Sequence, residues 1–268
     1  LVTAAMPKAV YQQRDRASGS TQFEMLKKLE LSDRDHKELY RHAEKRGIEF
    51  LSTPFDEKRL DFLVELGVKK IKIPSGEITN GPLLVAAART SLPVILSTGM
   101  ASVREIEQAL GALAFGYATK RSEAPSRRAF CRAYQCKRNK RAMSKKVVLM
   151  QCTSGYPTPL VDVNILAMDT LRKNFGLPIG LSDHSVGINS ALAAVARGAC
   201  VIEKHFTLNR NLEGPDHRAS LEPLGLKSLV VAVREIESAM GNGVKRVMPS
   251  EAENLFIARQ SIVAARPI

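Results

Sequence analysis

The sequence has few cysteines and no long apolar run. Only four of its 268 residues are cysteine, which is too few for a disulfide framework in a chain of this size. No apolar stretch approaches the ~20 residues that a membrane-spanning helix needs, and no signal-peptide-like segment opens the sequence. These absences argue against a disulfide-stabilised secreted fold and against a membrane partner. They predict a cytoplasmic protein.

Acidic residues are scarce in one segment. The net charge of +13 comes from 40 Lys and Arg against 27 Asp and Glu. The stretch 120–146 alone holds eleven Lys or Arg and one Glu, about +10 of that charge. The basic character therefore belongs to one segment and not to the whole surface.

Six short apolar runs each end in a polar cluster. They cover residues 48–54, 70–77, 93–99, 147–154, 178–184 and 200–205. Their apolar residues are mostly consecutive, a pattern typical of strands buried on both faces in a parallel sheet. Helical periodicity with capping and glycine stop signals predicts helices near 33–46, 56–66, 102–114, 189–197 and 225–240.

Repeated strand–helix units predict an α/β fold of the (β/α)8 TIM-barrel type. Six of the eight units are visible, and residues 1–30 show no strand pattern. An open doubly wound sheet, which does not need eight strands, is the alternative. The interval between the strands at 93 and 147 is twice the usual length. We therefore interpret residues 117–146 as a basic insertion outside the framework, with the composition of a solvated loop.

Two histidines follow neighbouring strands directly. His184 and His205 should face the same pocket, since strand ends converge at the mouth of a barrel. With the nearby carboxylates Asp183, Glu203 and Asp216 they can hold a divalent ion and leave positions open for substrate. The alternative is a pair of hydrogen-bonded histidines that closes the barrel.

Lys72 points inward from the second run, and hydroxyl residues follow at successive strand ends. A lysine here can bind phosphate or carboxylate as a point charge or form a Schiff base. Hydroxyls and backbone amides suit an anion, although simple capping of the strand ends is the alternative. The hydroxyl residues are Ser75, Ser97, Thr98, Thr153 and Ser154, and the carboxylate Glu77 follows Ser75 by two residues.

At these residues the chain resembles the sialic acid synthase family, also called the N-acetylneuraminate synthase family. The matching motifs run through most of the sequence. They are LSTPF at 51–55, KIPSGE at 72–77, LSTGM at 96–100, QCTSGYP at 151–157, PIGLSDH at 178–184, EKHFT at 203–207, GPDH at 214–217 and ASLEP at 219–223.

The resemblance implies condensation of phosphoenolpyruvate with an N-acetylated hexose aldehyde, such as N-acetylmannosamine, to give a sialic-acid-type nonulosonate and phosphate. It implies a divalent cofactor, Mn²⁺ first and Mg²⁺ or Co²⁺ as alternatives. By resemblance His184 and His205 would ligate the metal, and Glu77, Lys72 and Asp216 would be catalytic. Lys72 would also hold phosphoenolpyruvate together with four serines, and Tyr156 and Asp216 would contact the sugar. Those serines are Ser75, Ser97, Ser154 and Ser182.

The resemblance also predicts a domain organisation. A TIM-barrel synthase domain would cover 1–245, and 246–268 would begin a linker toward a C-terminal antifreeze-like domain. Two strand–helix units would precede residue 1, so the chain would be truncated at both ends relative to the family, whose full-length form is a homodimer. Two other readings stay open. One is a non-catalytic remnant of the family, and the other is nucleic-acid binding through the basic segment, with Phe130 and Tyr134 stacking on bases.

Overall fold

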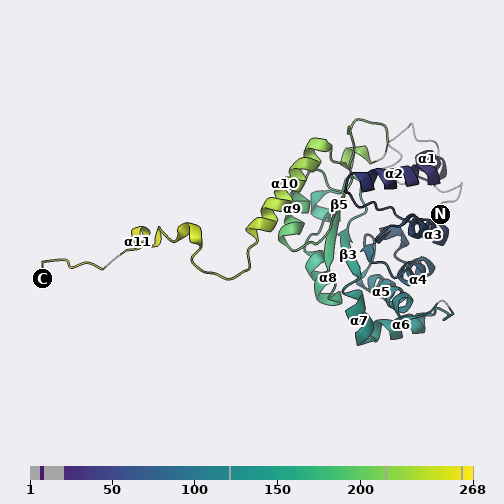
Figure 1. Cartoon of the computed structure of the whole chain (residues 1–268), viewed down its shortest axis with the longest axis horizontal. Coiled ribbons are helices and arrows are strands. Elements are labelled where there is room, and N and C mark those ends of the chain that lie inside the picture. The colour runs from purple at the N-terminus through teal and green to yellow at the C-terminus, as the bar shows by residue number, and fades with distance from the viewer. Residues whose placement is uncertain (1–6, 9–20, 121, 215, 261, 268) are drawn as a thin grey trace.

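The fold is a curled parallel sheet with helices outside it (Figure 1). The computed structural model describes residues 7–8, 21–120, 122–214, 216–260 and 262–267. Its strands are β1 (Ile71–Ile73), β2 (Val94–Ser97), β3 (Val147–Cys152), β4 (Ile179–Asp183) and β5 (Ile202–Lys204), all parallel and in sequence order across the sheet. A doubly wound sheet reverses its strand order at a switch point, so that alternative is wrong.

A contact between the two edge strands shows how strongly the sheet curls. Lys72 of β1 reaches across the concave face to Glu203 of β5, with 3.3 Å between Nζ and Oε2. The five described strands therefore form a half-barrel, as expected for part of a (β/α) barrel.

Helices that follow the strands cover the convex face and bury the core. These are α4 (Gly81–Arg89), α5 (Val103–Ala118), α8 (Ala167–Phe175), α9 (Asn189–Ala196) and α10 (Pro223–Ala239). Their apolar faces pack on the strands; Leu84, Leu110 and Leu149, for example, are fully buried in one cluster. The helices predicted from 102, 189 and 225 are confirmed within a few residues.

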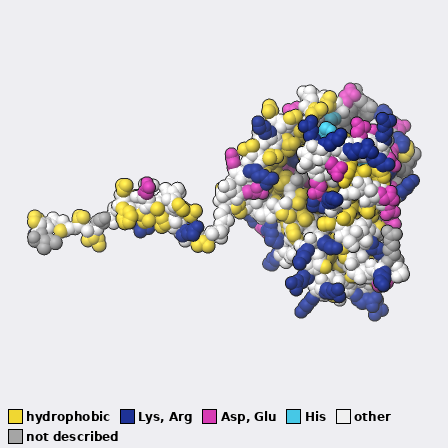
Figure 2. Space-filling view, in the orientation of Figure 1, with side chains coloured by type: hydrophobic (Ala, Val, Ile, Leu, Met, Phe, Trp, Pro, Cys, Tyr) yellow, Lys and Arg dark blue, Asp and Glu magenta, His cyan; other side chains and the backbone are white. Residues whose placement is uncertain are grey.

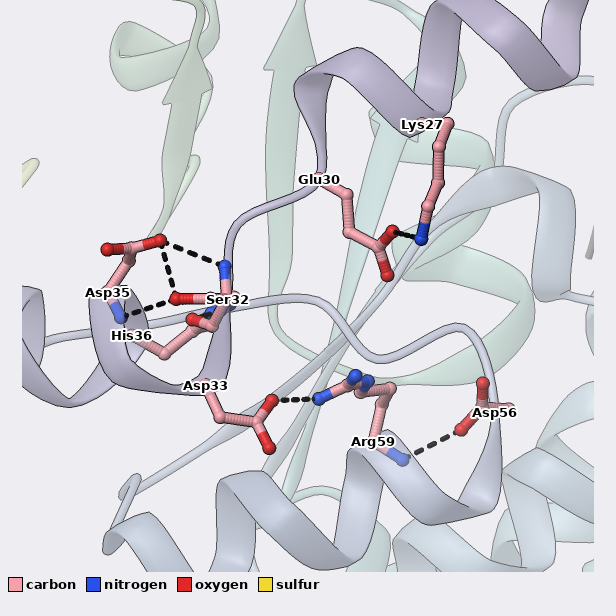
Figure 3. Close-up of polar contacts among 8 residues, drawn as sticks. All are labelled: Lys27, Glu30, Ser32, Asp33, Asp35, His36, Asp56 and Arg59. Atoms are coloured by element: carbon pink, nitrogen blue, oxygen red, sulfur yellow. Dashed lines mark hydrogen bonds and ion pairs between the residues drawn. The ribbon is translucent and has the colours of Figure 1, made fainter.

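In the described residues before the sheet the chain forms three helices: α1 (Gln22–Leu29), α2 (Asp33–Lys45) and α3 (Glu57–Leu66). Ser32 and Asp35 form the capping box expected at the start of α2. An ion pair between Asp33 and Arg59 joins α2 to α3 (Figure 3). The prediction of no strand over 1–30 lies largely outside the described residues, and its described part from 22 to 29 is helical.

The predicted strand at 48–54 is wrong. Residues 48–54 have no strand structure, although Glu49 pairs with Lys70 just before β1. Among the described residues no backbone ladder joins this segment to β1. A strand is stabilised by pairing along its edge, and the apolar pattern of the segment does not reveal whether that pairing forms.

The prediction of a solvated loop for 117–146 is also wrong. Helix α5 continues to residue 118, and α6 (Arg127–Gln135) and α7 (Lys137–Met143) follow. Phe130 packs on Phe115 of α5, with ring centroids 5.4 Å apart, so it is not free to stack on bases. Lys and Arg side chains gather at the end of the molecule where α6 and α7 lie (Figure 2).

The segment after α10 runs away from the sheet, and its described residues form short helical turns, η6 (Pro249–Glu251) and α11 (Leu255–Ala258) (Figure 1). Other single turns are η3 (Ser75–Glu77), η4 (Leu160–Asp162) and η5 (His217–Ala219). Within the described ranges no helix has the length and hydropathy to cross a membrane. All four cysteines are free.

Candidate functional site

A buried polar cluster lies on the concave face of the sheet, where four strands contribute one side chain each. Lys72 of β1 donates from Nζ to Oγ of Ser97 on β2 at 2.9 Å. The same ammonium lies 3.3 Å from Glu203 on β5, and Ser182 of β4 donates to the other oxygen of Glu203 at 2.7 Å. Lys72, Ser97 and Ser182 are each buried. Three of the predicted substrate ligands therefore meet in one place.

A second group of polar atoms surrounds Gly99, just beyond the end of β2. The Gly99 amide donates to Oγ of Ser75 at 2.9 Å. A Cβ placed on Gly99 would come within 2.6 Å of Ser154 Oγ, 2.8 Å of Ser75 Oγ and 3.2 Å of Cys152 Sγ. The missing side chain of Gly99 thus lets two predicted substrate ligands, Ser75 and Ser154, approach each other.

The hydrogen bonds decide which hydroxyls can donate to an anion. A serine hydroxyl has one hydrogen and two lone pairs. Ser97 accepts from Lys72, so its own hydrogen remains for another acceptor. Ser75 accepts from the Gly99 amide, and its hydroxyl also hydrogen-bonds to the Cys152 sulfur. Ser182 gives its hydrogen to Glu203. Ser97 is therefore better placed than Ser182 to donate to a phosphate or carboxylate.

The two histidines lie side by side at the ends of β4 and β5. Their ring centroids are 5.3 Å apart. Nδ1 of His184 is 2.8 Å from the carbonyl oxygen of Thr153, and the carbonyl can only accept. The hydrogen of a neutral His184 ring is therefore on Nδ1, which leaves Nε2 with a lone pair for a ligand.

The surroundings move the pKa values of the two histidines in opposite directions. Burial lowers the pKa of His205 below its usual value; the nearby Asp216 carboxylate opposes this, and His184 adds to it. Burial also acts to lower the pKa of His184, but its contacts with Cys152 and the Thr153 carbonyl outweigh burial and raise it. At neutral pH the neutral form that a metal requires is thus better favoured at His205.

Tyr156 and Asp216 lie next to the histidines. The Tyr156 ring is 4.2 Å from the ring of His184 and 5.5 Å from that of His205, measured between centroids. Oδ2 of Asp216 is 3.9 Å from Nδ1 of His205, and its Oδ1 is buried without a hydrogen-bond partner. These positions, at the same rim as the buried cluster, suit contacts with a second substrate.

Glu77 is less closely connected to the site. It lies on η3 after β1, and its carboxylate accepts from the Asn80 side chain at 2.7 Å. Asn80 in turn caps α4. The contacts of Glu77 therefore connect it to the α4 cap rather than to the buried cluster or the histidines.

Sequence reasoning missed the part that Glu203 plays and placed Asp183 wrongly. Glu203 contacts both Lys72 and Ser182, whereas the sequence only indicated a carboxylate near the histidines. Asp183 is fully buried and pairs with Lys204 rather than facing the histidines. The sequence did contain a signal for these two placements. Neighbouring residues of a strand face opposite sides of a sheet, so along β4 and β5 Glu203 should share a face with the histidines and Asp183 should not.

The fold and rim define a barrel-type scaffold with a buried polar cluster at the carboxyl ends of parallel strands. The chain belongs to the NeuB family, whose model matches residues 1–245. It is 46% identical over its whole length to N,N'-diacetyllegionaminic acid synthase of Campylobacter jejuni and spans 73% of that protein. It is 36% identical to human N-acetylneuraminate-9-phosphate synthase over 87% of the chain and 58% of the human protein.

Solved structures agree with the family assignment. The sialic acid synthetase of Leptospira borgpetersenii, crystallised with citrate, superposes with a TM-score of 0.72 at 34% identity and covers 92% of this chain and 77% of its own. A truncated 3-deoxy-D-arabino-heptulosonate 7-phosphate synthase from Thermotoga maritima has a TM-score of 0.59 at 21% identity, over 81% of this chain and 76% of that one. At that identity the second likeness shows the fold alone.

Proposed function

We propose that this chain carries the catalytic barrel of a nonulosonate synthase. It joins phosphoenolpyruvate to an N-acetylated hexose aldehyde and releases phosphate. In this reaction C3 of phosphoenolpyruvate attacks the aldehyde carbon, water adds to the cation at C2, and the C2–O bond to phosphate then breaks. The acceptor is N-acetylmannosamine or a related sugar; relatives named as legionaminic, pseudaminic and neuraminate-9-phosphate synthases support this class.

The observation that carries the proposal is the buried contact between Lys72 and Ser97 on the concave face. A lysine ammonium and a free hydroxyl hydrogen, both shielded from water, offset the charge of a bound phosphate or carboxylate more strongly than they would on the surface. The Lys72 ammonium forms an ion pair with Glu203, whereas a Schiff-base nucleophile must act as a neutral amine. The ion pair therefore supports Lys72 as an anion ligand rather than a Schiff-base nucleophile.

The other side chains place the second substrate and the protons. Tyr156 and Asp216 lie close enough to the histidines to orient a sugar beside the anion pocket. Ser75 and Ser154 would complete the anion contacts beyond β2. Glu77 would handle protons at the edge of the site. A homodimer of the full-length form stays a prediction.

The two histidines fit a divalent cofactor. Nε2 of His184 has a free lone pair, and the His205 ring is adjacent. In the described part of the chain no three His, Cys, Asp or Glu side chains gather as a metal site. The protein would thus supply two imidazoles and leave the other positions to water and substrate. A bound Mn²⁺, or Mg²⁺ or Co²⁺, would polarise the aldehyde oxygen.

The test combines binding and turnover. Isothermal titration of phosphoenolpyruvate should show saturable binding that is lost in Lys72→Met. Phosphate release should require phosphoenolpyruvate, an N-acetylated hexose and Mn²⁺ together. Equal binding by the two proteins would contradict the anion pocket. Binding without turnover under all metal conditions would support the other reading, a non-catalytic remnant of the family.

A further inference from the structure

A buried ion pair lies directly beside the two histidines but on the opposite face of the sheet. Asp183, the last residue of β4, and Lys204, the last residue of β5, pair at 2.7 Å between Oδ2 and Nζ. Their side chains are 0% and 4% exposed. None of the roles proposed above for the synthase reaction uses either residue.

The register of β4 and β5 shows which parts of the two strands the Asp183–Lys204 pair joins. Ser182 is paired with Glu203 across the two strands, and Asp183 with Lys204. Because successive side chains alternate between faces, Ser182 and Glu203 point to the concave pocket while Asp183 and Lys204 point outward. The next residue on each chain is a histidine. A side-chain pair therefore joins the two strands on each face, immediately before His184 and His205.

The contacts around Asp183 make the outer pair rigid. Oδ1 of Asp183 accepts from the Ser185 amide at 2.8 Å and from the Ser185 hydroxyl at 2.7 Å. The ammonium of Lys204 also donates to the Ser185 carbonyl, and Ser185 reaches Ser190 at the start of α9 at 3.0 Å. The Asp183 carboxylate and the Lys204 ammonium thus each have several partners, and the backbone of Ser185, just after His184, is hydrogen-bonded to both.

We propose that Asp183 and Lys204 are positioning residues that set the spacing and orientation of His184 and His205. A buried ion pair adds little net stability compared with apolar side chains of similar size, because desolvation cancels much of the attraction. Its geometry is nevertheless specific, since any other register would leave a buried charge unpaired. The pair therefore fixes how β4 and β5 end, and with that the geometry of the two imidazoles. The metal-binding consequence rests on the proposed function.

The test replaces the pair by apolar side chains, Asp183→Leu with Lys204→Met, so that no buried charge is left alone. The matched control is Glu49→Leu with Lys70→Met, which removes an exposed pair at the opposite end of the sheet. The first readout is the ¹⁵N NMR signature of His184, which reports whether Nδ1 keeps its hydrogen. The second is Mn²⁺ affinity measured by titration, without substrate.

The double variant should still fold, with a lower urea midpoint than the wild type, because the buried amide and hydroxyl of Ser185 lose their acceptor on Asp183. His184 should nevertheless lose its single tautomer, and Mn²⁺ affinity should fall by about 10- to 100-fold, as for other partners that orient metal ligands. The control should change neither readout. If the double variant keeps both the tautomer and the affinity, the proposal is wrong.

A second variant covers the case in which the double variant does not fold. Ser185→Ala removes one hydrogen bond to Asp183 and leaves both charges in place. It should weaken Mn²⁺ binding and broaden the His184 signal to a smaller degree, and an unchanged protein would overturn the proposal. If the wild type itself binds no Mn²⁺, the metal part of the proposed function fails, while the NMR readout still decides the positioning role.

Discussion

Replacing Gly99 by alanine tests whether Ser75 and Ser154 form part of the anion site. The added Cβ would lie 2.6 Å from Ser154 Oγ and 2.8 Å from Ser75 Oγ. Both distances are well below van der Waals contact, so at least one hydroxyl must move. Gly99 does not need a left-handed backbone, because its φ is not positive. The effect of the substitution therefore comes from space and not from backbone strain.

The expected magnitude follows from these contacts. Overpacking of a tight site costs about 1–3 kcal/mol of unfolding free energy. A displaced Ser75 also loses its hydrogen bond from the Gly99 amide. A hydrogen bond to a charged ligand is worth about 1.5–3 kcal/mol, so the loss of one hydroxyl should weaken phosphoenolpyruvate binding about tenfold or more.

Gly76→Ala is the matched control. Gly76 lies next to Ser75, and a Cβ there would meet nothing within 4 Å. Urea unfolding should place this variant within about 0.5 kcal/mol of the wild type, and calorimetry should give wild-type affinity for phosphoenolpyruvate. The reasoning is refuted if Gly99→Ala unfolds and binds in the same way as Gly76→Ala.

Three further outcomes are expected. Lys72→Met should weaken phosphoenolpyruvate binding by at least about tenfold, since it removes a charged hydrogen-bond donor; calorimetry measures this, and unchanged affinity contradicts the role. In an NMR pH titration the pKa of His205, lowered by burial, should lie below about 6.5 and that of His184 above it. The raised pKa of His184 stabilises the fold below about pH 6.5, and this contribution is lost as the pH rises through the folded-state value; the reverse order of the two titrations would disprove the assignment. Phe130→Ala should destabilise the protein by about 0.5–3 kcal/mol in urea unfolding, whereas the exposed Arg132→Ala should stay within about 0.5 kcal/mol; equal effects would show that α6 does not pack on α5.

Periodicity predicted the parts of the fold that depend on local pattern. The strands that end at Ser97, Cys152 and Asp183 are continuous apolar runs closed by polar residues, and the structure contains all three. The run from Ile48 has the same pattern, but a strand also requires a neighbour that accepts its backbone hydrogen bonds. That neighbour is a property of the whole sheet, which the local sequence does not describe.

The prediction of a solvated loop for residues 117–146 was wrong because it rested on charge, whereas packing determines the structure of this segment. The basic segment looked unfit to fold because Arg and Lys dominate its composition, but only one face of a helix must be apolar. Ala129, Phe130, Ala133 and Tyr134 supply that face on α6 and pack against the core. In the candidate site, the motifs led us to expect Lys72 and Ser97 at the same rim, and the two side chains are hydrogen-bonded there. Their role as substrate ligands stays a prediction. The hydrogen bond from Ser182 to Glu203 follows from the register of β4 and β5, and the contact of Lys72 with Glu203 follows from the curl of the sheet. The spacing of residues in the sequence predicts neither.

The contact between Lys72 and Glu203 also has a consequence for the order of folding. It joins the first and last strands of the sheet, which lie far apart along the chain, and three other strands lie between them. Contacts of such long sequence separation form late, because a large loop must first be closed at a cost in chain entropy. The proposed anion pocket should therefore be absent from partly folded chains, and a ligand that binds there should slow unfolding without speeding the early steps of folding.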